Sequence, residues 1–112
     1  MTDLEMTKLC AEAMGKPIIL STDGLGIGHI MINESSGSAT SFNIYNYDPL
    51  HDDAQAMALV KKFRLFIAHD DTDFWVEWAG TIGGKDKVSW RAHPDINRAI
   101  VECVAKMQKA KA

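Results

Sequence analysis

The sequence contains little cysteine and no long apolar run. Cys10 and Cys103 are the two cysteines among 112 residues, 93 positions apart, which excludes a disulfide framework and paired cysteine metal ligands. We expect both to be buried thiols. No apolar run approaches the ~20 residues that span a bilayer, and the first five residues lack the basic and apolar order of a secretory signal. We therefore expect a cytoplasmic protein that spans no membrane, folded as a single domain over residues 1–112.

An excess of positive charge is also lacking, since the formal net charge is -3. Residues 1–84 carry five basic and twelve acidic side chains, whereas residues 85–112 carry seven basic and three acidic ones. The acidic part would repel a polyanion, which disfavours nucleic-acid binding. Lys106, Lys109 and Lys111 fall where a helix is expected to end, and cations stabilise that end of a helix.

Three amphipathic helices are predicted from apolar spacing and from their start and stop signals. Thr2 and Glu5 form a capping box for a helix over about 3–14, which Gly15 ends. The aspartates at 52–53 can cap a second helix, closed by the basic residues 61, 62 and 64. A third helix opens at His93-Pro94-Asp95, where we expect Pro94 in the first turn.

Strands are predicted at 65–68, 74–79 and 87–92. The first two are almost entirely apolar, which predicts a sheet covered on both faces. The third alternates, with Val88, Trp90 and Ala92 on one side, and lies nearer an edge; a glycine-bearing link predicts a hairpin with its predecessor. Weaker candidates are 17–20, 28–32 and 42–45. The predicted fold is α+β, with three amphipathic helices packed on a small, mostly antiparallel β-sheet in an α/β/α sandwich-like arrangement.

Three segments of the sequence resemble the phage ABA sandwich domain family: Leu9–Gly15, Tyr45–Asp52 and Arg98–Ala105. The resemblance implies a small bacteriophage or prophage protein with helices on the two sides of a β-sheet, from a family whose function is uncharacterised. It supplies no catalytic residues. The chain departs from the family's pattern at Lys16 and Asp53, where such proteins tend to place an aromatic residue.

A glycine-rich segment runs from Asp23 to Gly28, with glycines at 24, 26 and 28. Exposed amides in the Gly24–Gly28 loop could cradle the phosphate of a nucleotide or another small ligand. However, the glycine spacing differs from the dinucleotide fingerprint, and the Lys-Ser/Thr pair of a P-loop does not follow. We favour a turn that enters a strand, with ligand binding as an alternative.

The tripeptide His-Asp-Asp occurs twice, at 51–53 and 69–71. If the two turns met, they could hold a divalent metal ion that activates water for hydrolysis, with His29 or Asp48 completing its shell. The candidate ligands are His51, Asp52, His69, Asp71 and Asp73. Helix capping and turn formation already account for these aspartates, so a metal-dependent hydrolase stays an alternative hypothesis.

Three tryptophans could anchor a protein interface or stack on a base or sugar: Trp75, Trp78 and Trp90. A doubly covered sheet would instead place them in the core. Trp75 shares a strand face with Glu77 and is the candidate interaction residue. The sequence offers no G-x-S-x-G turn, and both cysteines lie on apolar helix faces.

The preferred hypothesis is a non-enzymatic phage accessory protein. It would need no cofactor and would act through contacts with an unidentified protein partner in the host cytoplasm. A homodimer is left open.

Overall fold

The computed structural model describes residues 1–16, 18–22, 28–35 and 42–111. In this part of the chain the elements follow the order helix, three strands, helix, three strands, helix. They are α1 (Asp3–Ala13), β1 (Ile18–Thr22), β2 (Gly28–Ser35), β3 (Phe42–Tyr47), α2 (Asp53–Phe63), β4 (Phe66–His69), β5 (Phe74–Ile82), β6 (Lys85–His93) and α3 (Ile96–Lys111).

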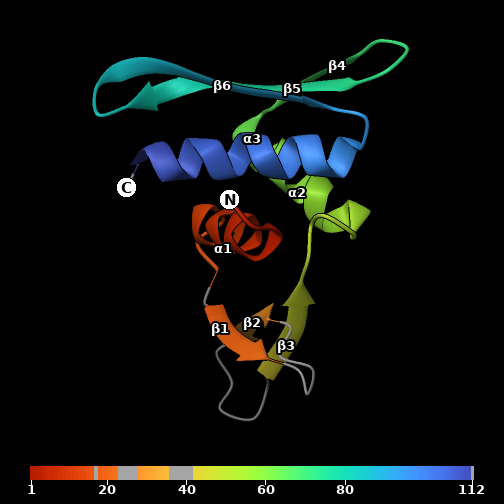
Figure 1. Ribbon diagram of the computed structural model, residues 1–112. Helices are drawn as coiled ribbons and strands as arrows, with labels where there is room; N and C mark the ends of the chain where they lie inside the picture. The colour runs from red at the N-terminus through yellow and green to blue at the C-terminus, as the bar shows by residue number, and fades with distance from the viewer. Residues whose placement is uncertain (17, 23–27, 36–41, 112) are drawn as a thin grey trace.

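The strands form two separate three-stranded sheets, in which all neighbours are antiparallel. The first has the order β1-β2-β3 and the second β4-β5-β6. The two sheets lie at opposite ends of the molecule, with the helices between them (Figure 1). The predicted α+β class is confirmed, and the expected antiparallel sheet is divided into two.

Side-chain caps fix where α1 and α2 begin. The Thr2 hydroxyl accepts a hydrogen bond from the Glu5 amide at 3.1 Å, and the Asp52 carboxylate accepts one from the Gln55 amide at 3.0 Å. α1 is followed by Gly15 at a φ of +70°, as predicted, and α2 ends at Arg64 in the left-handed conformation.

The start of α3 differs slightly from the prediction. The Asp95 carboxylate accepts from the Asn97 amide at 3.0 Å, and the helix begins at Ile96. We expected Pro94 in the first turn of this helix, but it lies before the cap residue Asp95 and therefore outside that turn. The Asn97 side chain donates to Asp53 at 2.8 Å, which ties the starts of α2 and α3 together.

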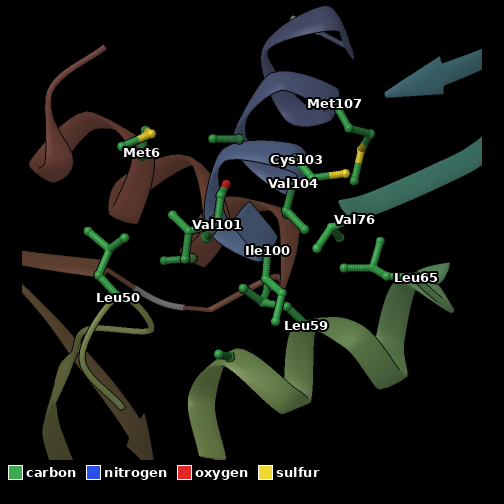
Figure 2. Packing of buried hydrophobic residues seen from close by; sticks show 14 of the residues in the cluster. Met6, Leu50, Leu59, Leu65, Val76, Ile100, Val101, Cys103, Val104 and Met107 are labelled. Carbon is green, nitrogen blue, oxygen red and sulfur yellow. The ribbon is translucent and has the colours of Figure 1, made fainter. Parts of the chain in front are cut away.

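One hydrophobic core joins both sheets and all three helices, and α3 contributes more side chains to it than any other element. Figure 2 shows Ile100 of α3 directed toward Leu59 of α2, and Val104 directed toward Val76 of β5. α1 adds buried Met6 to this cluster. Each large aliphatic side chain buried here contributes roughly 1.5–3 kcal/mol to the free energy of unfolding.

Both cysteines are buried thiols, as predicted. The Cys10 thiol donates to the Val101 carbonyl at 3.5 Å, and the Cys103 thiol donates to the Ser89 carbonyl at 3.3 Å. Burial raises the pKa of Cys10 to about 12 and also raises that of Cys103. Both groups are therefore neutral and poor nucleophiles near pH 7.

Candidate functional site

The second sheet buries only one of its faces. Val76 and Trp78 of β5 face α3 and are buried, and Ser89 of β6 is buried beside them. The Ser89 hydroxyl donates to the Cys103 carbonyl of α3 at 2.9 Å. Because side chains alternate along a strand, the intervening residues point away from the helices. The prediction of a sheet covered on both faces is therefore wrong.

The uncovered side of this sheet carries a cluster of large rings. Phe66 of β4 is 65% exposed, Trp75 of β5 is 43% exposed, and Trp90 of β6 is 49% exposed. Trp78, on the opposite side, is only 8% exposed. The core position that a doubly covered sheet would give the tryptophans thus holds for Trp78 and fails for Trp90 and for Trp75, the candidate interaction residue. We call the outward side chains of Phe66, Ala68, Trp75, Glu77, Val88 and Trp90 the aromatic face.

The strand register places an acidic residue among these rings. Glu77 lies directly opposite Phe66 of β4 on one side and opposite Trp90 of β6 on the other. Trp75 is two residues before Glu77 on the same face and is flanked by Ala68 and Ala92. Three aromatic side chains therefore surround one carboxylate on an open sheet.

The two exposed tryptophans stack on each other. Their ring centroids are 5.6 Å apart and their planes differ by 15°. Next to them is a groove of about 380 Å³ lined by Phe66, Ala68, Trp75, Val76, Glu77 and Trp90. Stacking favours one relative orientation of the two indoles, which form aromatic sides of the groove.

The aromatic face is acidic. The outward residues of β4, β5 and β6 include Glu77 and Asp86 and no lysine or arginine, because Lys85, Lys87 and Arg91 alternate to the other side. Arg91 accordingly lies 3.9 Å from Glu102 of α3.

The turn between β4 and β5 adds further negative charge at one end of this face, with Asp70, Asp71 and Asp73. The Asp73 and Thr72 amides and the Thr72 hydroxyl donate to the Asp70 carboxylate, which lowers its pKa to about 2. Asp70 is therefore charged at neutral pH.

The candidate metal ligands have other roles. His51 is exposed and its Nδ1 lies 2.8 Å from an oxygen of Asp48, while Asp52 caps α2. The His69 ring packs against that of Phe74 at 5.9 Å. Asp71 and Asp73 belong to the exposed β4–β5 turn. Within the described ranges, no three histidine, cysteine, aspartate or glutamate side chains are grouped so that they could hold a metal ion.

Residues 23–27 lie outside the described part of the chain, and so does the side chain of His29. The predicted turn and the alternative of ligand binding at Gly24–Gly28 both stay predictions.

Of the three lysines expected at the end of α3, two lie in its last turn, and Lys106 lies before that turn. Lys109 and Lys111 are exposed in the last turn of α3, where they compensate the partial negative charge of the helix terminus. Near its start, Arg98 pairs with Glu102 at 3.0 Å and with Asp3 of α1 at 3.1 Å. No helix in the described ranges is long and apolar enough to cross a bilayer.

The aromatic face was only partly foreseen. Trp75 and Glu77 were expected to share a strand face, and this pairing identifies the face. Phe66 was missed, because an unbroken apolar run at 65–68 has no polar residue to mark its outer side. Trp90 was named as a possible interface anchor, but the alternation in 87–92 did not indicate which side of the strand would face the core.

Comparisons of the chain with protein-family models, with curated proteins and with solved structures find no match, so the resemblance to the phage ABA sandwich domain family stays a prediction.

Proposed function

We propose that the protein is a non-enzymatic binding module that recognises a partner protein through the aromatic face. In this proposal it is a phage-encoded accessory protein that acts in the cytoplasm of the bacterial host. The observation that supports it is the set of exposed rings, Phe66, Trp75 and Trp90, side by side on an uncovered sheet.

The packing of the domain does not require these rings. Polar residues could occupy the outer side of an antiparallel sheet without loss of core, since the inner side is already filled by Val76, Trp78 and their neighbours. Single exposed apolar residues are common on proteins, but a contiguous group is typical of an interface. Tryptophan in particular supplies a large contact area at a small cost in side-chain entropy.

Enzymatic alternatives receive less support from the described residues. The two cysteines are buried and neutral, and the two His-Asp-Asp turns supply caps, turn formers and a ring contact. The groove on the aromatic face is lined by aromatic and aliphatic side chains with one carboxylate. That composition suits binding better than acid-base chemistry.

The test is capture of partners from phage-infected bacterial cells by three forms of the protein. These are the wild type, a Trp75→Ser/Trp90→Ser variant, and a Met57→Ser control that removes an equally exposed apolar side chain from α2. Circular dichroism and thermal unfolding must first show that all three are folded.

We expect a protein that is retained by the wild type and the control and is lost from the double variant. The same protein, purified, should then bind with the same preference. If the purified partner binds the double variant as tightly as the wild type, or if the double variant loses no partner, the aromatic face is not the binding surface.

A further inference from the structure

We infer that the partner inserts an arginine side chain into the groove of the aromatic face, where its guanidinium pairs with Glu77 and stacks on the surrounding rings. This inference rests on the proposed function and specifies the chemistry of the partner. It follows from what surrounds the Glu77 carboxylate.

The Glu77 carboxylate is not paired within the described part of the chain. Among the described residues, no side chain forms a hydrogen bond or an ion pair with its carboxylate. The nearest positions are aromatic: Phe66 and Trp90 are directly opposite, at Cβ separations of about 5 Å, and Trp75 is about 7 Å away along the strand. A cation bound to this carboxylate would therefore lie within reach of three ring faces.

Arginine fits this arrangement better than lysine. The planar guanidinium can donate two parallel hydrogen bonds to a carboxylate and can stack on an indole at the same time. The two tryptophans stack with their planes 15° apart, so each covers one face of the other and offers its opposite face to a planar cation. Lysine, a compact and strongly hydrated charge, gains less from an open surface.

The charge of the face argues against a second copy of this chain in a face-to-face dimer. Such a dimer would bring Glu77 and Asp86 of one copy against the same residues of the other, with no outward lysine or arginine on either sheet. Like charges at an interface are repulsive. A partner that supplies positive charge together with apolar contacts to Phe66 and Val88 complements the face instead.

The inference can be tested with short peptides on the isotope-labelled full chain. One peptide has a central arginine between glycines, the second has citrulline, its neutral isostere, and the third has lysine. The indole N–H signals of Trp75 and Trp90 report on the aromatic face, and that of Trp78 on the opposite side of the sheet is an internal control.

We expect the arginine peptide to shift the Trp75 and Trp90 signals with a millimolar Kd and to leave Trp78 unchanged. The lysine peptide should bind more weakly, and the citrulline peptide should bind least. Glu77→Gln should weaken arginine binding about fivefold. The control Asp86→Asn makes the same charge change at the far end of the hairpin, opposite Thr81, and should alter binding less than twofold.

Equal shifts with arginine and citrulline, no shift at about 20 mM peptide, or unchanged binding to Glu77→Gln would overturn the inference. So would a dimer that forms with rising concentration in sedimentation experiments and is lost in the Trp75→Ser/Trp90→Ser variant. The two failures can be told apart. A partner that is lost from that variant but is insensitive to Glu77→Gln would contradict only the arginine inference and would leave the proposed function standing.

Discussion

At the scale of single residues, short-range hydrogen bonds decide where the elements begin. The side chains of Thr2, Asp52 and Asp95 each accept a hydrogen bond from a backbone amide two or three residues further along the chain. These bonds depend on local sequence alone, which is why the helix starts could be predicted. The His-Asp-Asp turn at 51–53 is explained in the same way, because its first aspartate is needed as a cap.

Replacing Asp52 by alanine removes the cap of α2. The Gln55 amide then has no acceptor at 3.0 Å, and we expect the free energy of unfolding to fall by about 1 kcal/mol. Urea denaturation measures the change. Asp52→Asn, which keeps a side-chain oxygen, is the control and should lose less than half as much; equal losses would show that the cap is not the cause.

The buried thiol of Cys10 makes stability depend on pH in the alkaline range. Its pKa is about 12 in the folded protein against 9.0 for an ordinary thiol, mainly because burial disfavours the thiolate. Between these values the unfolded chain loses a proton that the folded chain keeps, so the free energy of unfolding falls as pH rises.

We therefore expect urea midpoints of the wild type to decrease from pH 9 to pH 11 more steeply than those of Cys10→Ala. Expressed as the free energy of unfolding, the slopes of the two proteins should differ by up to about 1.4 kcal/mol per pH unit, which corresponds to one proton. Burial is the main cause that raises the pKa of Tyr47, and Cys10 adds to that shift, so the comparison with Cys10→Ala also includes the part of the Tyr47 shift that Cys10 causes. Parallel slopes would show that Cys10 ionises normally.

At the scale of elements, the alternation of side chains along β5 and β6 separates a structural side of the sheet from a binding side. Trp78 lies under the sheet and Trp75 lies over it, three residues apart. Their consequences for stability should therefore differ.

Trp78→Ala should lower the free energy of unfolding by about 3–5 kcal/mol, because it leaves a cavity in the core. Trp75→Ala should change it by less than about 1 kcal/mol, since the side chain is exposed and loses mainly its stacking on Trp90. Chemical denaturation of the two variants provides the measurement. Comparable losses would mean that the outer side of the sheet is also structural.

Sequence alone predicted the type and order of most elements but not which side of the second sheet is covered. Helices 3–14 and 52–64 and the hairpin between β5 and β6 follow from local signals: caps, Gly15, and the Gly83-Gly84 turn with both φ angles positive. Local signals did not indicate which side of 87–92 faces outward, because the buried residue in this strand is the small polar Ser89. Its hydroxyl donates to the Cys103 carbonyl of α3, a tertiary contact that strand periodicity cannot reveal.

At the scale of the whole molecule, α3 is the element on which the others pack. It contacts α1, α2, β5 and β6, and the side chains at 99–101 and 103–105 are almost completely buried. Separation of α3 from the rest would expose most of the core, so its opening should require global unfolding.

Hydrogen exchange should show this order. We expect the amides of residues 101–105 to exchange with the free energy of global unfolding, and those of the exposed β4–β5 turn to exchange much faster. Mass spectrometry over a time course, with stability from urea denaturation as the reference, provides the comparison. Exchange in α3 that is faster than in the middle of β5 would contradict a central role for this helix.

The division of six strands into two sheets also affects how the protein behaves at high concentration. A single six-stranded sheet would have two edge strands, whereas among the described residues β1, β3, β4 and β6 each have one neighbouring strand. Edge strands can pair with other chains, and charged side chains oppose this. β6 begins with Lys85, Asp86 and Lys87, and these charges oppose pairing of that half of its edge with another chain. We expect aggregation of the pure protein to start at the other half of this edge, beside Trp90.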